Sequence, residues 1–259
     1  ARHGILGPLI RSIFIPEKDC KWGIFDYSQQ EPRLVVHYAN KNGFPGAGKF
    51  LDSYQKDNTT DFHTMVSEIA DIPRKQAKTI NLGLFYGMGK GKLMSQLGVS
   101  EEEATELLQS YHEKVPFVKK LTYDTQGIAN KNGFLTTIQG RRCRFDLWES
   151  ELEWGKKALP EEEAGREYGK KTIKRAWTYK ALNKLIQGSA ADQIKTAMIH
   201  LHREGYVSHI QVHDELDFSV ASDADKNKIK EIMETCLPKL EVPSKVDVEC
   251  GDNWGDAGD

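Results

Sequence analysis

The chain has 259 residues, 39% of them hydrophobic, and a formal net charge of −2 at pH 7. This length and composition allow a substantial core, in one large domain or in two closely packed subdomains. The near-zero charge disfavours a passive nucleic-acid coat, which usually carries a clear basic excess. Because no apolar run reaches the roughly 18 residues of a membrane span and the N-terminus lacks a signal-peptide pattern, we expect a soluble, cytoplasmic protein that does not enter a membrane.

The cysteines are far apart in the sequence, at positions Cys20, Cys143, Cys236 and Cys250. None of them forms the Cys-x-x-Cys pair that is typical of zinc or redox sites. We therefore expect four reduced thiols.

The first elements expected are two strands and a helix. Residues 13–16 predict a short strand with its turn, and residues 22–26 predict a second strand that ends at Asp26. Ser28 and Glu31 have the spacing of a capping box, so a helix is predicted to start there and to continue through Tyr38. Glu31 is either a capping residue or part of an active site, and the two roles are compatible.

Residues 40–60 are polar and predict a loop. Within it, residues 43–49 carry the glycine and lysine spacing of a phosphate-binding loop. That motif needs Ser or Thr at the next position, a preceding buried strand and a following helix. Phe50 occupies the next position and a helix end comes before the motif, so the sequence argues against a nucleotide site of this kind.

A helix with one cationic end is predicted after Pro73, which suits a first helical turn. Arg74, Lys78, Leu82 and Tyr86 recur every four residues, which gives a slowly drifting stripe roughly 18 Å long. A stripe that begins cationic and ends aromatic suits a nucleotide, with phosphates at one end and sugar and base at the other. The alternative is an ordinary amphipathic helix with a basic start.

The middle of the chain predicts scaffold and candidate phosphate contacts. Ser100 opens a second capping box, and we expect its helix to be scaffold. Residues 133–142 predict a hairpin, whose Arg141 and Arg142 are candidates to meet a phosphate backbone. Residues 148–176 are dense in charge and predict an exposed, mostly helical excursion. Such basic clusters are more often solvated faces than phosphate contacts.

A long helix is predicted over residues 178–201, and it places Asn183 and Gln187 one turn apart on the same side. Small residues follow these amides, which allows close approach to nucleic acid and hydrogen bonds to base edges or sugars. A tightly packed helix contact explains the same pattern equally well.

Two carboxylates stand where apolar strands end. Asp26 ends the second predicted strand, and Asp214 lies in His213-Asp214-Glu215 at the turn of a predicted hairpin with alternating apolar residues. Two carboxylates at strand ends can hold a pair of divalent cations roughly 3.5–4 Å apart. Such a pair activates an attacking oxygen and neutralises a leaving phosphate, so these acids outline a two-metal site.

Three segments in this order resemble motifs A, B and C of family A DNA polymerases, the family of DNA polymerase I. Motif A, Asp-Tyr-Ser-Gln-x-Glu-x-Arg, is met by residues 26–33, and motif C, His-Asp-Glu, by residues 213–215. Motif B is met by Arg74-x3-Lys78-x7-Tyr86-Gly87. The similarity is greatest to bacteriophage members, and it extends to Asp61-x-His63, Asn183-x3-Gln187-Gly188 and Gly251-Asp252-Asn253-Trp254.

This resemblance implies an α/β protein of the α+β type, in which an antiparallel palm sheet bears carboxylates at its strand ends beside a mainly helical fingers subdomain. We expect the first part of the palm in residues 1–60 and the fingers in residues 61–145. Residues 146–259 would form the second part of the palm, with the charged excursion and motif C. The chain would then be the C-terminal palm and fingers portion of a longer polymerase, with the thumb and any exonuclease domain upstream.

The implied activity is template-directed DNA synthesis, in which a deoxynucleotide is added to a primer 3′-hydroxyl by a two-metal transfer that releases pyrophosphate. Such an enzyme serves DNA replication, repair or both, in the host-cell cytoplasm if the source is viral. The implied partners are primer-template DNA, deoxynucleoside triphosphates and the upstream thumb. The implied cofactor is Mg²⁺, as two ions that Mn²⁺ can replace.

The resemblance assigns each role to a residue of this sequence. The metal-binding groups are Asp26, Asp214 and the backbone carbonyl of Tyr27, and Glu215 is an auxiliary acid. The residues expected to bind the incoming nucleotide are Gln29, Glu31, His63, Arg74, Lys78, Leu82 and Tyr86. Among them, Lys78 is a candidate to protonate the pyrophosphate, and Glu31 is expected to exclude a ribose 2′-hydroxyl with the support of Tyr86. The residues expected to contact DNA are Arg141, Arg142, Tyr179, Asn183, Gln187 and His213.

Some positions depart from the family pattern. Leu82 stands where Phe or Tyr is usual beside the incoming sugar, and the missing tyrosine hydroxyl predicts discrimination against dideoxynucleotides. Gln30 and Pro32 replace apolar residues of motif A, which affects local packing and not the carboxylates. Tyr179 replaces an arginine that many bacterial members direct toward the primer.

Two other classes of protein stay open. A two-metal nuclease also uses strand-end acids, but it has no need of the stripe from Arg74 to Tyr86. Metal-dependent degradation without nucleotide incorporation would favour that class. A catalytically silent nucleic-acid-binding module would bind DNA equally well after Asp26→Ala or Asp214→Ala.

Overall fold

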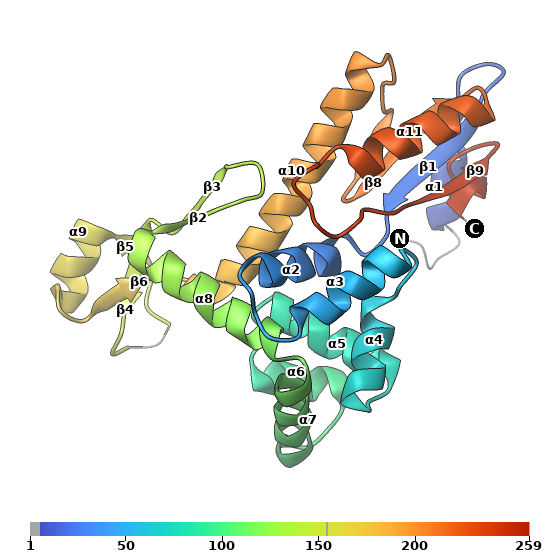
Figure 1. Cartoon of the computed structure of the whole chain (residues 1–259). Helices are drawn as coiled ribbons and strands as arrows, with labels where there is room; N and C mark the ends of the chain where they lie inside the picture. The colour runs from blue at the N-terminus through green and yellow to red at the C-terminus, as the bar shows by residue number, and fades with distance from the viewer. Residues whose placement is uncertain (1–5, 154, 259) are drawn as a thin grey trace. The chain divides into compact units, whose positions relative to one another are not determined.

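The computed structural model describes residues 6–153 and 155–258, which combine many helices with antiparallel sheets (Figure 1). Within these two ranges there is a four-stranded, a three-stranded and a two-stranded sheet, and every strand pair in them is antiparallel. The expected α+β architecture is therefore confirmed. None of the helices described is long and apolar enough to cross a membrane.

The chain divides into two compact units. The first takes in the described parts of Ala1–Leu34, Ser53–Thr59 and Ala190–Asp259, and the second comprises Val35–Asp52 and Thr60–Ser189. The division falls within three helices, which are α2 (Gln30–Lys41), α3 (Ala47–Lys56) and α10 (Ala181–Arg203). These units and the expected palm and fingers are different divisions of the chain, so the subdomain boundaries stay a prediction.

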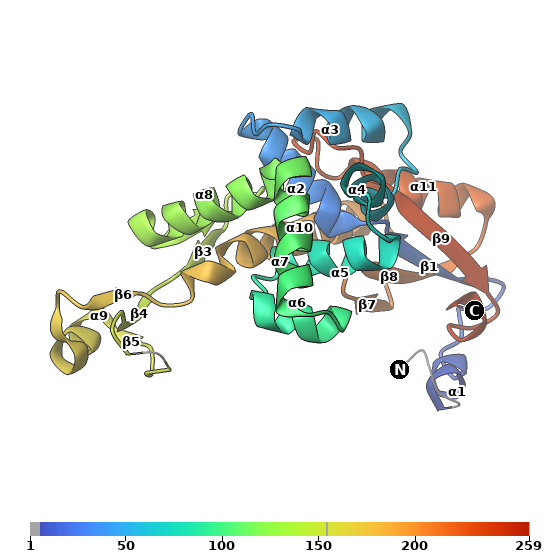
Figure 2. The ribbon, with the colours of Figure 1, turned by 90° about the horizontal axis from the view of Figure 1, so that it is seen from below.

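The first unit is built on the four-stranded sheet, whose strand order is β7-β8-β1-β9. Its strands are β7 (Ile210–Val212), β8 (Glu215–Val220), β1 (Lys21–Tyr27) and β9 (Val246–Gly251). β1 is central and pairs with both β8 and β9, while α11 (Asp223–Thr235) packs on β8 and β9 (Figures 1 and 2). Outside the sheet, α1 (Leu6–Ser12) precedes β1 and the short 3-10 helix η3 (Asp256–Gly258) follows β9.

The two faces of this sheet differ in chemistry. Alternate residues of a strand point to opposite faces, and directly paired residues of neighbouring strands point to the same face. Phe25 and Leu216 are paired and fully buried on one face. Asp26 and Glu215 are paired on the other face, and Asp217 lies two residues further along β8 on that side. The apolar face holds the sheet in the core, and the second face gathers carboxylates.

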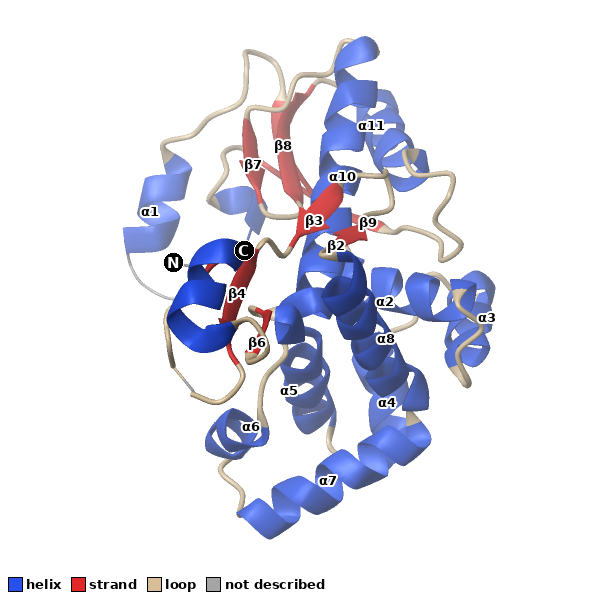
Figure 3. Ribbon diagram, turned by 90° about the vertical axis from the view of Figure 1, so that its left-hand side faces the viewer, coloured by secondary structure: helices blue, strands red, loops and turns tan. Residues whose placement is uncertain are grey.

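Helices dominate the second unit (Figure 3). They include α4 (Phe62–Ala70), α5 (Arg74–Phe85), α6 (Lys90–Leu97), α7 (Glu101–Lys114) and α8 (Pro116–Asn132). The predicted capping box of α7 is confirmed, because the Ser100 hydroxyl accepts from the Glu103 amide and the Glu103 carboxylate accepts from the Ser100 amide. Aromatic rings fill the core between these helices. Phe50 lies 5.2 Å from Phe62 and 5.1 Å from Phe117 between ring centroids.

The expectation of a loop over residues 40–60 is wrong, because α2 extends to Lys41 and α3 occupies Ala47–Lys56. Ala47, Phe50 and Tyr54 of α3 are all buried. Their spacing of three and four residues is that of an amphipathic helix, which polar neighbours concealed in the sequence. At residues 43–49 a helix and not a strand precedes the glycine and lysine motif, and Phe50 packs into the aromatic core.

The predicted hairpin after α8 is confirmed, with β2 (Phe134–Thr136) paired to β3 (Arg142–Arg144). The excursion that follows is exposed, as expected, but it is not mostly helical. It forms a sheet of order β5-β4-β6 from β4 (Leu147–Ser150), β5 (Leu159–Pro160) and β6 (Ile173–Arg175). Its helical part is limited to α9 (Glu161–Ala164) and the π-helix η1 (Gly165–Gly169), and the 3-10 helix η2 (Thr178–Lys180) leads into α10. The short strands lack the length at which period-two alternation becomes visible in a sequence.

The strand expected at residues 13–16 is not formed. The chain turns there after α1, with the Phe14 amide donating to the Arg11 carbonyl. Phe14 accepts a backbone hydrogen bond from Trp254, and the two rings meet edge to face at 5.4 Å. This tertiary contact replaces the sheet pairing that the apolar run predicted.

The cysteines Cys20, Cys143, Cys236 and Cys250 are free thiols, as predicted. Cys236 is buried, and burial raises the pKa of its thiol. A thiol of this kind is a packing residue and not a reactive nucleophile.

Candidate active site

The predicted hairpin of motif C is confirmed, and it brings the two key acids to one end of the four-stranded sheet. Asp214 lies in the turn between β7 and β8, beside His213, which has a left-handed backbone with φ of 56°. The backbone amide of Tyr27 donates to the carbonyl of Asp214 at 3.2 Å, and Asp26 pairs in register with Glu215. Sheet pairing therefore joins Asp26, Tyr27, Asp214 and Glu215, which are far apart in the sequence.

Two acids of β8 are more deeply buried than the acids at the strand ends. Glu215 is 2% exposed and Asp217 is fully buried, whereas Asp26 and Asp214 are partly accessible. Neither carboxyl oxygen of Asp217 has a hydrogen-bond partner among the described residues. Burial, together with the nearby charge of Glu215, raises the pKa of Asp217 to about 7. Sequence patterning missed Asp217, because a polar residue in a strand normally indicates an exposed face.

The start of α2 differs from the predicted capping box. Gln29 adopts a left-handed backbone with φ of 54°, and the helix begins at Gln30. Ser28 is therefore not the residue that directly precedes the helix. The Tyr54 hydroxyl donates to the side-chain oxygen of Gln29 at 3.4 Å, while Glu31 lies half-buried in the first turn.

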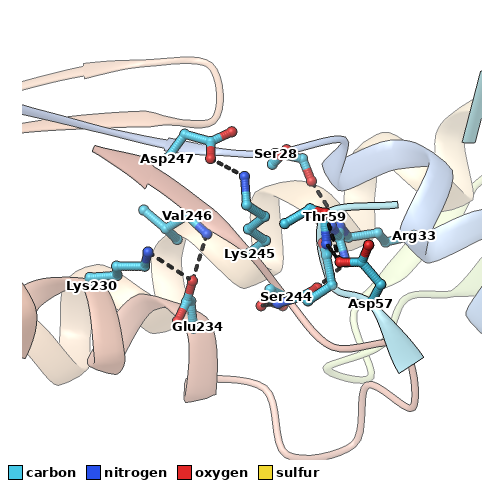
Figure 4. A network of polar contacts seen from close by, with 11 residues as sticks. Ser28, Arg33, Asp57, Thr59, Lys230, Glu234, Ser244, Lys245, Val246 and Asp247 are labelled. Carbon is cyan, nitrogen blue, oxygen red and sulfur yellow. Dashed lines mark hydrogen bonds and ion pairs between the residues drawn. The ribbon is translucent and has the colours of Figure 1, made fainter. Parts of the chain in front are cut away.

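Arg33 is buried and lies close to Ser28, two residues after Asp26 (Figure 4). Its guanidinium donates to the Ser28 carbonyl at 2.9 Å, to the Asn58 side chain at 2.6 Å and to the Pro243 carbonyl at 2.5 Å. It also lies over the Tyr54 ring, 4.5 Å from the centroid. The Ser28 amide in turn donates to the Lys245 carbonyl at 2.9 Å. These bonds fix the residues that follow Asp26 to the segment that precedes β9.

A short polar network continues along that segment. Lys245 forms an ion pair with Asp247, and the Glu234 carboxylate accepts from the Val246 amide at 2.8 Å (Figure 4). On the α10 side, the Gln193 amide donates to the Ser244 hydroxyl at 2.9 Å. The backbone around the acidic face is thus held by hydrogen bonds as well as by the sheet.

The stripe of α5 in the second unit is solvent-facing. Arg74, Lys78 and Tyr86 are exposed and Leu82 is half-buried, whereas Ala77, Ile80, Asn81 and Phe85 are buried on the opposite side. The amphipathic pattern and the exposed cationic stripe are therefore two sides of one helix.

Asp61 positions Arg74. The Asp61 carboxylate caps α4 by accepting from the Thr64 amide at 2.6 Å, and it accepts from the Arg74 guanidinium at 2.9 Å. Partial burial raises the pKa of Asp61, but the hydrogen bonds from Arg74 and Thr64 outweigh it and hold the pKa below its ordinary value. The guanidinium stays exposed to solvent while one of its edges is oriented.

His63 lies in a buried network that the sequence did not reveal. The Tyr111 hydroxyl donates to the Asn81 side-chain oxygen at 2.6 Å, and the Asn81 amide nitrogen lies 2.9 Å from Nδ1 of His63. Because the amide oxygen accepts from Tyr111, the amide nitrogen donates to Nδ1 and the ring proton resides on Nε2. Burial lowers the pKa of His63, with Lys78 and Arg74 adding to the effect, so a neutral ring offers an Nε2–H donor.

Tyr86 ends α5 next to η2. Gly87 has φ of +68°, and a Cβ at this position would lie 2.8 Å from the carbonyl oxygen of Tyr179. Only glycine allows this close approach, which packs the end of α5 against the backbone of η2. Tyr179 is 48% exposed and Tyr86 is 41% exposed, so two accessible rings belong to adjoining segments.

The remaining candidate DNA contacts gather around the start of α10. Asn183 is half-buried and Gln187 is exposed on this helix. The Arg141 guanidinium donates to the Gly188 carbonyl at 2.7 Å, and Arg142 lies over the Phe134 ring at 4.5 Å. The hairpin arginines are thus partly engaged by the protein, although their side chains stay exposed.

The predicted site residues fall into two sets. The first unit contains Asp26, Tyr27, Gln29, Glu31, His213, Asp214 and Glu215. The second unit contains His63, Arg74, Lys78, Leu82, Tyr86, Arg141, Arg142, Tyr179, Asn183 and Gln187.

Comparison with known proteins identifies the family. Residues 4–256 match the sequence profile of DNA polymerase family A. The chain belongs to this family. The family prediction made from motifs A, B and C is therefore confirmed.

Similar proteins include phage and bacterial polymerases. A DNA-directed DNA polymerase of Pseudomonas phage M6 is 38% identical over 286 residues, covering 95% of this chain and 40% of the relative. DNA polymerase I of Bacillus subtilis (strain 168) is 33% identical over 272 residues, covering 97% of this chain and 28% of the relative. This family A chain therefore spans less than half the length of these relatives.

A solved structure shares the fold. The POL domain of Pol1 from M. smegmatis, in complex with DNA primer-template and dNTP, matches with a TM-score of 0.77 and 29% identity. The match covers 99% of this chain and 44% of that chain. The mixed helical and antiparallel-sheet fold is thus that of a family A polymerase domain.

Proposed function

We propose that this chain catalyses template-directed DNA synthesis, adding a deoxynucleotide to the 3′-hydroxyl of a primer with release of pyrophosphate. The observation that carries the proposal is the convergence of Asp26, Tyr27, Asp214 and Glu215 at one sheet end in a member of DNA polymerase family A. The Pol1 relative bound to primer-template and dNTP supports the same substrates. The role would be DNA replication, repair or both.

The donor set fits Mg²⁺ or Mn²⁺. Asp26 and Asp214 offer carboxylate oxygens and Tyr27 a backbone carbonyl, and hard divalent cations prefer such oxygen ligands. Mg²⁺ is usually bound through one or two carboxylates plus substrate phosphates, and it retains water. Among the residues described, no three His, Cys, Asp or Glu side chains cluster as a preformed metal cage. Two bound ions would lower the pKa of the primer hydroxyl and neutralise charge on the departing pyrophosphate.

The protein residues would orient the nucleotide. Arg74 and Lys78 would bind the triphosphate by charge-assisted hydrogen bonds, and His63 would donate from Nε2 to a phosphate oxygen. Lys78 would also deliver a proton to the pyrophosphate. The residues that would surround the sugar and base are Gln29, Glu31, Leu82 and Tyr86, with Glu31 excluding a ribose 2′-hydroxyl.

DNA would be bound by the exposed amides and cations of the second unit and by the motif C turn. The residues proposed for this contact are Arg141, Arg142, Tyr179, Asn183, Gln187 and His213. Base pairing with the template would select the nucleotide. An upstream thumb of the same polymerase would strengthen binding of the duplex.

The test is incorporation of one templated nucleotide into a labelled primer-template with Mg²⁺, comparing the chain with Asp214→Asn. The neutral variant keeps the shape of the side chain, and we expect at least a 1,000-fold loss of rate, equivalent to about 4 kcal/mol. Glu249→Gln is the matched control, because Glu249 is an exposed acid of the same sheet, on β9. It should retain activity within about threefold.

Failure to incorporate under conditions of measured DNA binding would contradict the proposal. So would an Asp214→Asn variant as active as Glu249→Gln. Metal-dependent degradation of the primer without any incorporation would instead identify a two-metal nuclease.

A further inference from the structure

A hollow of about 410 Å³ lies in the second unit, lined by residues of α8, β4, β6 and η2 and by Glu151. Its volume is in the range of natural ligand sites, roughly 300–1,000 Å³. It adjoins the small sheet of the charged excursion, and among its lining residues only Tyr179 has a role in the proposed function.

The lining combines ring faces with amides. Trp148 from β4 and Tyr179 from η2 supply aromatic rings, and Gln126 and Asn130 from α8 supply amide groups. Aromatic faces stack on bases of any identity, with binding energies of about 1–3 kcal/mol per base. Amides can donate to and accept from base edges. This set of side chains suits a nucleobase.

The charged residues of the lining favour a nucleotide over a free phosphate. Trp148 pairs in register with Arg175 and Glu149 with Lys174, so the side chains of Glu149 and Lys174 point to the sheet face opposite that of Trp148. Glu149 and Glu151 both line the hollow, and two carboxylates oppose a purely anionic ligand.

The Trp148 ring is held in place by Arg175 before any ligand binds. The Arg175 guanidinium stacks on Trp148 at 4.7 Å from the ring centroid. Arg175 is itself anchored, because it donates to the Asn130 carbonyl at 3.1 Å and to the Phe145 carbonyl at 3.0 Å. A preorganised ring loses little freedom when a ligand stacks on it.

The position of the hollow indicates which strand of the DNA would bind in it. Tyr179 lines it, and Gly87 packs against the carbonyl of Tyr179, which makes Tyr86 the residue next to this contact. Gln187 follows Tyr179 by eight residues, which is about 12 Å along a helix and about three to four nucleotides of a DNA strand. In the proposed function Tyr86 lies beside the sugar and base of the incoming nucleotide, and Gln187 contacts the duplex. A template strand that passes these residues reaches the hollow before it is copied.

We infer that this hollow binds an unpaired nucleotide of the template strand, with its base against Trp148 and Tyr179 and its edge toward Gln126 and Asn130. The inference rests on the proposed function for the source of the strand. A base within a duplex is stacked on both sides, so only the single-stranded overhang can enter. The small sheet of the excursion thus guides the template before it is copied.

The test measures how much a template overhang adds to DNA binding. Fluorescence anisotropy would compare the chain on a blunt duplex and on the same duplex with a four-nucleotide 5′ overhang, both without nucleotide. We expect the overhang to strengthen binding by about 5- to 150-fold, the equivalent of one stacked base. Asn130→Ala and Trp148→Leu should remove most of this gain while they leave the affinity for the blunt duplex within about twofold.

Tyr123→Ala is the matched control, because Tyr123 is an exposed aromatic residue of α8 that does not line the hollow. It should keep the full gain. Asn130→Ala keeps the test valid if Trp148→Leu does not fold. Arg175 donates to the backbone carbonyl of Asn130, and alanine retains that carbonyl. No gain from the overhang, or equal weakening of both duplexes by Asn130→Ala, would overturn the inference.

A second measurement locates the base directly. A duplex with 5-iododeoxyuridine at the first or second overhang position would be irradiated with the chain, and the attached peptides identified by mass spectrometry. We expect attachment to peptides that contain Trp148 or Tyr179, and attachment only elsewhere would overturn the inference. If the chain incorporates nucleotides without an overhang gain, the inference fails and the proposed function stands. If the gain and the cross-link occur without incorporation, the proposed function fails and the hollow still binds single-stranded DNA.

Discussion

Two arginines of motif segments, one in each unit, show two uses of the same side chain. Arg33 in the first unit is buried, and its donors are taken up by Ser28, Asn58 and Pro243. Arg74 in the second unit is exposed and is oriented along one edge by Asp61 and Thr64. A buried arginine with all its bonds inside the protein holds backbone in place, whereas an exposed arginine with one oriented edge is available to an anionic ligand.

Replacement of the two arginines should therefore have opposite consequences. Arg33→Met keeps apolar bulk but leaves buried carbonyl groups without a donor, so we expect about 3–5 kcal/mol less free energy of unfolding. Arg74→Met should cost about 1 kcal/mol or less, as for an exposed ion pair. Urea denaturation followed by circular dichroism measures both. Similar losses for the two variants would show that exposure does not distinguish their roles.

Among the variants of the second unit, the largest effect on activity is expected from the cationic stripe. Arg74→Gln and Lys78→Gln each remove a charge-assisted hydrogen bond to phosphate, so kcat/KM for the incoming nucleotide should fall about 100-fold. Lys75→Gln, an exposed lysine of the same helix outside the stripe, should stay within about threefold of the parent. Single-turnover incorporation over a range of nucleotide concentrations measures all three. If kcat/KM fell as much in Lys75→Gln as in Lys78→Gln, a position in the stripe would not be what determines nucleotide binding.

Asp217 sharpens the contrast between buried and exposed acids. Its folded pKa of about 7 lies above the unfolded value near 3.9, so the folded state binds more protons between these values and stability falls as pH rises across that window. Asp217→Asn removes the charge, and we expect it to raise the free energy of unfolding at pH 8 by about 1–3 kcal/mol. The gain should disappear near pH 4. Thermal unfolding at several pH values measures this, and a gain independent of pH would contradict a charged carboxylate as its cause.

A smaller effect with the opposite pH dependence is expected for Asp61. Its folded pKa is depressed, so its contribution to stability is present above the unfolded value near 3.9 and is lost as pH falls through the folded value. Asp61→Asn can still cap α4 but loses the ion pair with Arg74, so we expect a cost of about 0.5–1 kcal/mol at pH 7. That cost should shrink as the pH falls below the unfolded value near 3.9. Denaturant unfolding at pH 7 and pH 3 compares the two forms.

Local periodicity predicted most of the elements that bear the site. The strand ending near Asp26, the hairpin around Asp214, the helix of the stripe and the helix of Asn183 all form where the sequence indicated. Each of these has strong alternation, a helical repeat or a recognisable capping residue within about ten residues. The strand expected at residues 13–16 was wrong because Phe14 packs on Trp254, which is distant in sequence. The loop expected over residues 40–60 was wrong because polar neighbours concealed the helical spacing of the buried residues of α3.

The networks around the candidate site could not be predicted. Asn81 reads as one more polar residue of a helix, yet it fixes the ring proton of His63 because Tyr111 occupies its oxygen. Arg33 matches motif A in sequence, but the hydrogen bonds by which it holds the backbone depend on Asn58 and Pro243. Hydrogen bonds of this kind join residues whose separation in the chain carries no periodic signal.

The sequence by itself determined the family, the order of the motifs and the residue types at the strand ends, because these depend on short stretches of chain. Only the tertiary structure decided which groups are buried, which donors are taken up inside the protein and where the excursion forms a sheet with a hollow beside α8. Burial and sheet pairing depend on contacts between distant segments. The surroundings of a carboxylate or guanidinium in the fold therefore decide whether it is available to a ligand or holds the protein backbone in place.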